Sequence, residues 1–293
     1  MGEINRKRCS MSISKKSKLP VGDFRIIKDK YIPEIESSLR KKPVLMPNAI
    51  YNASGIRIQG TRFKSLIFST DIAMIRNSNA QAVFAVYPFT PQLAIVQSII
   101  QGSSIPVFAG VGGGTTSGAR SVSIALECEL LGAYGVVVNA PMKNEVIRDM
   151  YNVLDIPIIA TVVSKNDDIV GKINAGARIL NVSGGKNTAE LVAYVRSIIG
   201  NRFPIIATGG DNETHIQNTI DAGSNAITYT PPSMASLFKE LMEDYRNESD
   251  ASADVSPNDP KKLHVREYLR DLVFPADAIE YIQKKGENKD DKE

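Results

Sequence analysis

Histidine, cysteine and tryptophan are scarce in this sequence of 293 residues, which has two histidines, two cysteines and no tryptophan. The cysteines, Cys9 and Cys128, can form at most one disulfide, so we expect a reducing compartment rather than a disulfide scaffold. Because His215 lies in an expected helix and His264 in the tail, we predict no catalytic pair of serine or cysteine with histidine.

Long apolar runs and a strong charge of one sign are also missing. No run approaches the length of a membrane span, and the basic N-terminus has no apolar stretch typical of a secretory signal, so we expect a cytoplasmic protein. The formal net charge is +3, which is too small to indicate a nucleic-acid partner. We therefore expect neither a membrane nor a nucleic acid as partner.

A regular alternation of short β-branched runs with helical segments begins near residue 63. The expected strands are 65–70, 82–87, 106–111, 135–139, 156–163, 178–182, 204–208 and 226–230. The expected helices are 72–78, 91–101, 118–131, 144–154, 167–175, 188–199, 213–222 and 234–245. Alternation of this kind demands a parallel sheet covered by helices, and eight units favour closure into a (β/α)8 barrel.

The rest of the chain consists of extensions around this barrel, which we place at 63–246. Residues 1–20 form a basic arm, for which a solvated, disordered tail is favoured over an arm that binds nucleic acid or an anionic surface. Residues 21–62 form an N-terminal extension with a short helix at 33–42 and a hairpin whose strands, 47–53 and 56–59, meet at a turn at Ser54 and Gly55. We expect this hairpin at the N-terminal end of the barrel, away from any site.

The C-terminal extension starts with a polar linker at 247–260, and a helical tail follows at 261–293. This tail could pack on its own barrel or on a neighbouring subunit, which makes a homo-oligomer one of the two alternatives.

Two glycine turns follow consecutive strands, in the stretches 181–188 (Asn-Val-Ser-Gly-Gly-Lys-Asn-Thr) and 205–212 (Ile-Ile-Ala-Thr-Gly-Gly-Asp-Asn). Backbone N–H groups at such a turn before a helix can hold an anion. We predict that the two turns lie side by side at one mouth of the barrel and bind a phosphate group. The predicted ligand-binding residues are Gly113, Gly114, Thr115, Gly184, Gly185, Thr208, Gly209, Gly210 and Asp211.

Four residues at the same ends of the strands are candidates for catalysis, namely Asp71, Asn181, Ser183 and Lys186. A lysine in a dry pocket can act as a base or form a Schiff base, but each charged residue here is equally well explained as a solvated loop charge. Carboxylate-held magnesium at Asp71 or Asp211 is an alternative, although we predict no metal and no cofactor.

Several motifs resemble those of known barrels. The runs 112–116 (Gly-Gly-Gly-Thr-Thr), 132–141 (Gly-Ala-Tyr-Gly-Val-Val-Val-Asn-Ala-Pro) and 208–210 (Thr-Gly-Gly) resemble the ribulose-phosphate-binding group, and 2-keto-3-deoxy-6-phosphogluconate aldolases in particular. That family has its Schiff-base lysine where this chain has Asn181, and a glutamate on strand two where this chain has none, so the aldolase mechanism does not carry over.

A longer signature is similar to an uncharacterised bacterial TIM-barrel family that is loosely labelled hydrolase. It comprises the runs 85–91 (Ala-Val-Tyr-Pro-Phe-Thr-Pro), 106–114 (Pro-Val-Phe-Ala-Gly-Val-Gly-Gly-Gly), 181–186 (Asn-Val-Ser-Gly-Gly-Lys) and 226–232 (Ala-Ile-Thr-Tyr-Thr-Pro-Pro). The favoured hypothesis is an enzyme, a hydrolase or a lyase, that acts on a small phosphorylated or polyhydroxylated metabolite. The alternative is a non-catalytic metabolite sensor.

Overall fold

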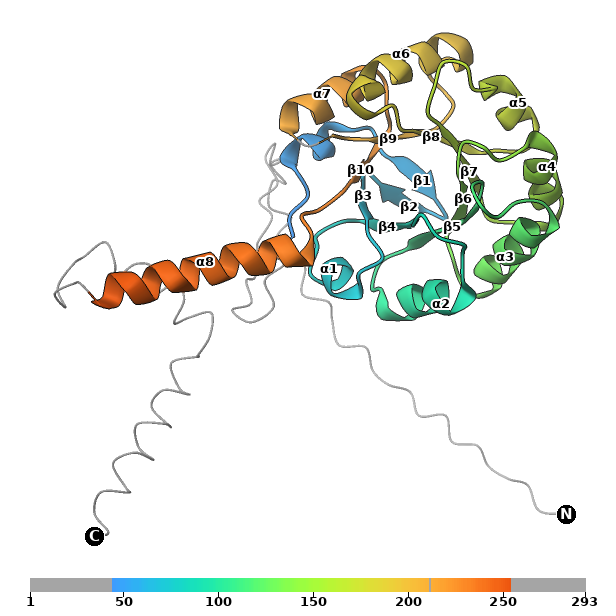
Figure 1. The fold of residues 1–293 in the computed structure, drawn as a ribbon. Helices are drawn as coiled ribbons and strands as arrows, with labels where there is room; N and C mark the ends of the chain where they lie inside the picture. The colour runs from blue at the N-terminus through green and yellow to red at the C-terminus, as the bar shows by residue number, and fades with distance from the viewer. Residues whose placement is uncertain (1–43, 211, 254–293) are drawn as a thin grey trace, which may run out of the picture. The chain divides into compact units, whose positions relative to one another are not determined.

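Eight short parallel strands form the centre of the computed structural model, which describes residues 44–210 and 212–253. The chain divides into two units, Met1–Ser37 and Ser38–Glu293, and every described residue belongs to the second. The strands pair in the order β10-β3-β4-β5-β6-β7-β8-β9, and β9 also pairs with β10, which closes the sheet. Figure 1 shows the ring of strands with helices outside it. The predicted (β/α)8 barrel is confirmed.

The bounds of these elements agree closely with the sequence pattern. The strands are β3 (Ser65–Phe68), β4 (Ala82–Ala85), β5 (Val107–Gly112), β6 (Gly135–Val138), β7 (Ile158–Val162), β8 (Ile179–Val182), β9 (Ile205–Thr208) and β10 (Ala226–Tyr229). The helices between them are α1 (Ile72–Arg76), α2 (Leu93–Gly102), α3 (Ala119–Leu130), α4 (Asn144–Val153), α5 (Ile169–Asn174), α6 (Thr188–Ile199) and α7 (Glu213–Asp221). Buried strands of β-branched residues and the helices between them produce a strong periodic signal, so each of these elements was predicted.

The last helix is longer than predicted. Helix α8 spans Met234–Ala253, so residues 247–253, which we predicted as part of a linker, are helical. The segment is polar, but it contains no proline or glycine before Pro257, and polarity alone does not end a helix. Met234 and Leu237 at the start of α8 pack against the barrel core.

The predicted N-terminal hairpin exists, but its strands are different from those we predicted. Residues 48–52 form a short 3-10 helix, η1 (Asn48–Asn52), and the hairpin pairs β1 (Ile56–Ile58) with β2 (Thr61–Phe63). Its turn is Gln59-Gly60, where both residues have positive φ (47° and 82°), as a two-residue hairpin turn requires. Ser54 and Gly55 do not form the hairpin turn that we predicted there. Instead, the Gly55 N–H donates a hydrogen bond to Asn225 O (2.7 Å).

This hairpin closes the N-terminal end of the barrel, as predicted. Ile56 and Phe63 belong to the cluster of side chains inside the barrel, and the Phe63 ring meets the rings of Phe108 and Tyr134 edge to face at 6.0 and 6.2 Å. Figure 1 shows β1 and β2 across the centre of the ring. The interior is therefore sealed at this end, and any ligand must enter from the carboxyl ends of the strands.

Two apolar clusters stabilise the barrel, one on each face of the sheet. The larger cluster lies between the outer face and the helices, and it includes Leu180, Val182 and Cys128. The smaller cluster fills the interior and includes Phe108, Ile179 and Ile206. Neighbouring residues of one strand thus point to opposite faces, which is the ordinary period of a strand. This alternation decides which residues reach the mouth of the barrel.

The predictions made for the two chain ends lie outside the described residues. These are the basic arm at 1–20, the helix at 33–42 and the tail at 261–293. In the part that the structure describes, none of the helices has the length and apolar character needed to cross a bilayer.

Cys128 supplies a prediction about pH and stability. The thiol is fully buried, and this burial, reinforced by the charge of nearby Glu127, raises its pKa from 9.0 to about 12. Between these values the unfolded chain loses the thiol proton and the folded chain keeps it, so stability falls as pH rises. Between pH 8 and pH 10 we expect a loss of about 1.4 kcal/mol that Cys128→Ala does not show.

The measurement is urea unfolding of both proteins at the two pH values, with Cys9→Ser in both backgrounds. The alanine variant is less stable at pH 8 because it leaves a cavity, but that cost does not depend on pH. A constant difference between the two proteins from pH 8 to pH 10 would contradict the prediction.

Candidate functional site

The side chains inside the barrel change from apolar to polar towards the carboxyl ends of β7, β8, β9 and β10. On each of these strands, an apolar interior residue is followed two positions later by a polar one. The pairs are Ile159 and Thr161, Ile179 and Asn181, Ile206 and Thr208, and Ala226 and Thr228. Since side chains two apart share a face of a strand, the four polar residues form one layer above the apolar interior.

This polar layer lies at an open pocket of about 560 Å³, which we call the central pocket. Pockets that hold small molecules measure about 300–1,000 Å³, so the central pocket has a suitable size. Its lining residues are Phe68, Phe84, Val86, Asn139, Ala140, Pro141, Thr161, Val163, Asn181, Ser183, Thr208, Thr228 and Thr230.

The pocket has two chemically different walls. Hydroxyls and the Asn181 carboxamide from the ends of β7 to β10 line one wall, and Phe68, Phe84 and Val86 from the ends of β3 and β4 line the other. The Phe68 and Phe84 rings lie 6.3 Å apart. Such a pocket suits a compact ligand that has polar groups on one side and carbon–hydrogen surface on the other.

Asn181 is the most deeply buried carboxamide of the pocket, with a relative exposure of 6%. Its Nδ2 donates to Thr161 Oγ1 at 3.3 Å, but its Oδ1 is buried and has no hydrogen-bond partner among the described residues. A buried acceptor without a donor costs about 1–3 kcal/mol, so its pairing with a ligand or a water molecule is favoured. Asn181 therefore lines the pocket and has an acceptor that no described residue satisfies.

The two glycine turns lie side by side at this mouth, as predicted. They follow β8 and β9, which are neighbours in the barrel. Thr208 Oγ1 donates to Ser183 Oγ at 3.1 Å and so joins the two strand ends directly. Asn181 and Ser183 share the interior face of their strand, so three predicted site residues, Asn181, Ser183 and Thr208, line the central pocket.

The other predicted residues of these turns lie away from the pocket. Gly184, Gly185, Gly209 and Gly210 line neither the central pocket nor the crevice described below, and Lys186 is exposed in the short 3-10 helix η2 (Gly185–Asn187). Asp211 lies outside the described residues.

Several of the backbone donors predicted to hold an anion already have partners. Gly184 N–H donates to Thr188 Oγ1 (3.1 Å), Gly209 N–H to Thr228 O (3.0 Å) and Gly113 N–H to Thr116 O (2.8 Å). A donor used in this way must break a hydrogen bond before it can bind a phosphate oxygen, which weakens the case for these turns as an anion site.

Gly209 also has a structural reason to be glycine. A side chain there would bring Cβ within 2.5 Å of Ile227 Cγ2 and 3.0 Å of Ile216 Cγ1, in the core. The positive φ of this turn belongs to Gly210 (82°). Substitution of Gly209 would therefore test core packing rather than ligand binding.

Asp71 has a structural role in α1. Its Oδ1 accepts hydrogen bonds from Ala73 N (2.8 Å) and Met74 N (3.2 Å), which is the geometry of an N-cap. The side chain is exposed and lines neither pocket. Capping accounts for an aspartate at this position without any catalytic role.

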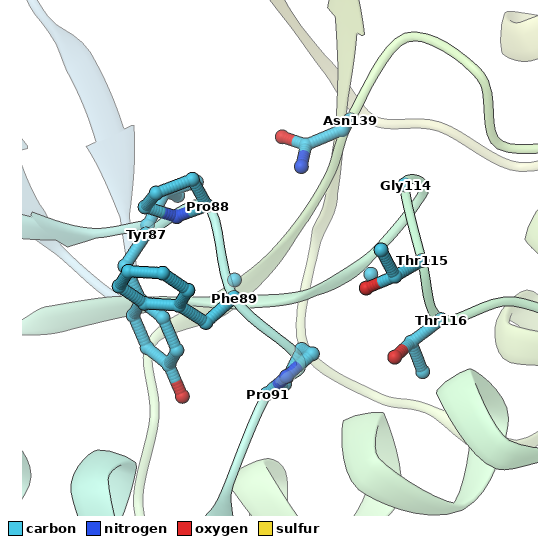
Figure 2. Close-up of a pocket in the computed structure, with 11 residues that line it drawn as sticks. Tyr87, Pro88, Phe89, Pro91, Gly114, Thr115, Thr116 and Asn139 are labelled. Carbon is cyan, nitrogen blue, oxygen red and sulfur yellow. The ribbon is translucent and has the colours of Figure 1, made fainter.

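A second depression adjoins the central pocket, and we call it the rim crevice. Figure 2 shows it between the loop 86–91 after β4 and the glycine loop 112–116 after β5. Its lining residues are Val86, Tyr87, Pro88, Phe89, Pro91, Gly110, Gly112, Gly114, Thr115, Thr116 and Asn139. Of the predicted ligand-binding residues, it contains Gly114 and Thr115.

Asn139 and Val86 line both spaces and so form the junction between them. In Figure 2 the Asn139 carboxamide points into the space flanked by the two loops. The Asn139 backbone is held by Gly113, where an added Cβ would lie 2.7 Å from Asn139 N and O, so only glycine allows this close approach.

Lys172 forms a hydrogen bond with the segment that follows Asn139. Its side chain on α5 is buried, and Nζ donates to Ala140 O at 2.9 Å. Burial lowers the pKa of Lys172, and the carboxylates of Asp167 and Asp168 oppose this shift. The ammonium thus supports the loop that carries Asn139, Ala140 and Pro141.

Charged side chains are missing from the described lining of both spaces. None of the lining residues is an aspartate, glutamate, lysine, arginine or histidine. Within residues 44–210 and 212–253, no three His, Cys, Asp or Glu side chains are close enough to hold a metal ion. The donors of the described site are hydroxyls and carboxamides, and its chemistry is hydrogen bonding by uncharged groups.

Sequence reasoning missed several residues of the site. Thr161, Thr228 and Phe84 were not among the predicted site residues, and Asn139 was noted only as the end of a strand. The usable signal was the alternation along each strand, since a polar residue two positions after an apolar interior residue recurs on four consecutive strands.

Comparison with known proteins identifies the fold but no family. No protein-family model matches the sequence, and no curated protein matches it. The structure is similar to that of a phosphoenolpyruvate phosphomutase from Streptomyces platensis subsp. rosaceus, with a TM-score of 0.51 and 11% identity over 83% of this chain and 96% of that chain. It is also similar to a phosphonopyruvate hydrolase, with a TM-score of 0.50 and 15% identity over 73% of this chain and 94% of the other.

At these identities the likeness concerns the fold. It agrees with the closed barrel described above, while the resemblance to 2-keto-3-deoxy-6-phosphogluconate aldolases stays a hypothesis that these comparisons do not support. The chain has a (β/α)8 TIM-barrel fold with a polar pocket at the carboxyl ends of its strands.

Proposed function

We propose that this protein binds a small, uncharged metabolite rich in hydroxyl groups in the central pocket. The observation that carries the proposal is that Asn181 lines the pocket while its buried Oδ1 lacks a donor among the described residues. A hydroxyl group of the ligand would supply that donor once the carboxamide turned towards the pocket, and Thr161, Ser183 and Thr208 would bind others. The apolar wall would contact the carbon skeleton.

An anionic ligand is less well supported. The two structural neighbours are named for phosphoenolpyruvate and phosphonopyruvate, which are anions, but a buried anion needs a charged or strongly hydrogen-bonding partner. The described lining contains no cation, and Gly184 and Gly209 have already used their N–H groups. A phosphorylated metabolite would depend on Lys186, which is exposed outside the pocket.

Binding is also better supported than catalysis. General acid–base catalysis needs a group that exchanges a proton near neutral pH, and the described lining of the central pocket offers only hydroxyls and carboxamides. A hydrolase or a lyase would need an acid or base from outside this described lining. A metabolite-binding protein without turnover needs neither.

The test is ligand-observed NMR with ribose and glucose beside ribose 5-phosphate and glucose 6-phosphate. We expect the neutral sugars to bind in the millimolar range or tighter, and Asn181→Leu to weaken them by about tenfold, since one hydrogen bond contributes about 1 kcal/mol and an unpaired group costs more. Asn152→Leu, at an exposed asparagine of α4, is the matched control. New sugar resonances in the same samples would reveal turnover.

Lys186→Ala separates the two ligand classes. The proposal expects this variant to bind the neutral sugars as the parent does. Binding of the phosphates alone, with loss in Lys186→Ala and none in Asn181→Leu, would overturn the proposal in favour of an anion site at the glycine turns.

A further inference from the structure

The rim crevice has features of a second binding position beside the central pocket. Phe89 is 74% exposed and stands beside Pro88 and Pro91, so this side of the crevice is apolar. Across from it lie Thr115 and the Asn139 carboxamide, which makes no hydrogen bond with any described residue. An exposed aromatic ring opposite hydrogen-bonding side chains can hold a ring whose faces are carbon–hydrogen surface and whose edge carries hydroxyls.

The walls of the crevice are already in place without a ligand. Tyr87 Oη accepts a hydrogen bond from Gln92 N–H (2.9 Å), which ties the loop 86–91 to the start of α2. Pro88 and Pro91 restrict the backbone of that loop. The hydroxyls of Thr90 and Thr115 approach to 3.4 Å and connect the two loops. A ligand would therefore lose little free energy in ordering these loops.

The size of the crevice limits what enters it. It has room for about 40 Å³, compared with about 560 Å³ in the central pocket. A water molecule needs about 10–15 Å³ on this scale, so the crevice holds a few atoms and not a whole ring. A second ring would have to lie over Phe89 with one edge in the crevice, next to Thr115 and Asn139.

We infer that the ligand is a two-ring saccharide, with one sugar in the central pocket and the second over Phe89. Asn139 lines both spaces, so its carboxamide is the group that binds near the linkage between the two rings. The inference rests on the proposed function, because it extends the same uncharged, hydroxylated ligand out of the central pocket. It adds a ligand class, a disaccharide or glycoside, and assigns Phe89 and Asn139 to the recognition of its outer part.

The experiment compares one-ring and two-ring sugars on the full-length protein. Glucose, galactose and mannose are titrated beside cellobiose, maltose and lactose, with binding followed by saturation-transfer NMR and calorimetry. We expect at least one disaccharide to bind tenfold or more tightly than the monosaccharides. Phe89→Ala should remove this advantage and leave the affinity for monosaccharides unchanged.

Two further variants make the result specific. Asn139→Ala should also reduce the preference for the disaccharide, while Phe238→Ala, at an exposed phenylalanine of α8, should leave it intact. Because Phe89 is largely exposed, its truncation should not unfold the protein, which thermal unfolding checks.

The outcomes separate this inference from the proposed function. Monosaccharides that bind as tightly as every disaccharide, or a disaccharide preference that survives Phe89→Ala, would overturn the two-ring ligand and leave the proposed function standing. Absence of binding by all six sugars would overturn both.

Discussion

Replacement of Arg196 by methionine is expected to destabilise the protein by about 3 kcal/mol or more, since each hydrogen bond to a charged group contributes about 1.5–3 kcal/mol. The Arg196 side chain on α6 is buried, with 9% exposure, and its three nitrogens all donate to other segments. Its contacts are Gly223 O (2.9 and 2.7 Å), Gly200 O (2.9 Å), Phe203 O (2.7 Å) and Asn225 Oδ1 (2.7 Å). Methionine fills similar space but leaves these acceptors without their donor.

The position of these contacts explains why Arg196→Met should cause a large loss of stability. They join the end of α6, the loop before β9 and the loop before β10, at the N-terminal end of the barrel. Asn225 also accepts from Ile205 N–H (2.9 Å) and donates to Ser54 Oγ (2.9 Å), so the network reaches the segment before the hairpin. No carboxylate takes part in the interactions found for Arg196, and its burial lowers the pKa of the guanidinium.

The measurement is urea unfolding of Arg196→Met, Arg196→Lys and Arg202→Met. Lysine keeps the charge but cannot reproduce five hydrogen bonds from a planar group, so we expect an intermediate loss. Arg202 is exposed in the same loop, and its replacement should change stability by less than about 0.5 kcal/mol. A loss below about 1 kcal/mol in Arg196→Met would show that water satisfies these carbonyl groups instead.

Asn181→Lys should cost several kcal/mol at pH 7, by comparison with Asn181→Met. Asn181 is 6% exposed and lies beside Thr161 and above Ile179. An ammonium introduced there would meet no carboxylate among the described lining residues, and burial lowers the pKa of a lysine, in extreme cases to about 5–6. A lowering of two to three pKa units corresponds to about 3–4 kcal/mol.

The direction in which the stability of Asn181→Lys changes with pH shows whether burial of the new ammonium causes the loss. Because the folded pKa would be lower than the unfolded one, the folded state binds fewer protons and stability rises with pH between the two values. The difference in free energy of unfolding between Asn181→Lys and Asn181→Met should therefore become smaller as pH approaches the ordinary lysine pKa of about 10.4. Urea unfolding at pH 7 and pH 10 measures this difference for both variants.

Asp211→Asn in both variants is the control for a carboxylate outside the described residues. If Asp211 compensates the new charge, the cost at pH 7 should grow in that background. Equal stability of the lysine and methionine variants at pH 7, with and without Asp211, would mean that position 181 is open to water.

The fold could be predicted from the sequence alone. Each barrel strand is a short buried run and each helix between strands has an apolar face, so local periodicity indicates eight units, and eight units close into a barrel. The sequence also indicated the mouth, because parallel strands end on the same side, and Asn181, Ser183 and Thr208 do line a pocket there. Local signals were weaker in the segment before the barrel. There we predicted the hairpin turn at Ser54-Gly55, but the structure has it at Gln59-Gly60.

Which polar residues share one pocket, and which N–H groups remain unused, depends on contacts that form in the folded protein. Strand register brings Thr161 next to Asn181 and Thr208 next to Thr228, and register depends on contacts between residues about 20 positions apart. The glycine turns resemble an anion site in sequence, but Gly184 and Gly209 donate to Thr188 and Thr228, which no local pattern reveals. Hydrogen-bond partners and burial arise from the folded arrangement of segments distant in sequence, so the absence of charged side chains from the described pocket lining became visible only in three dimensions.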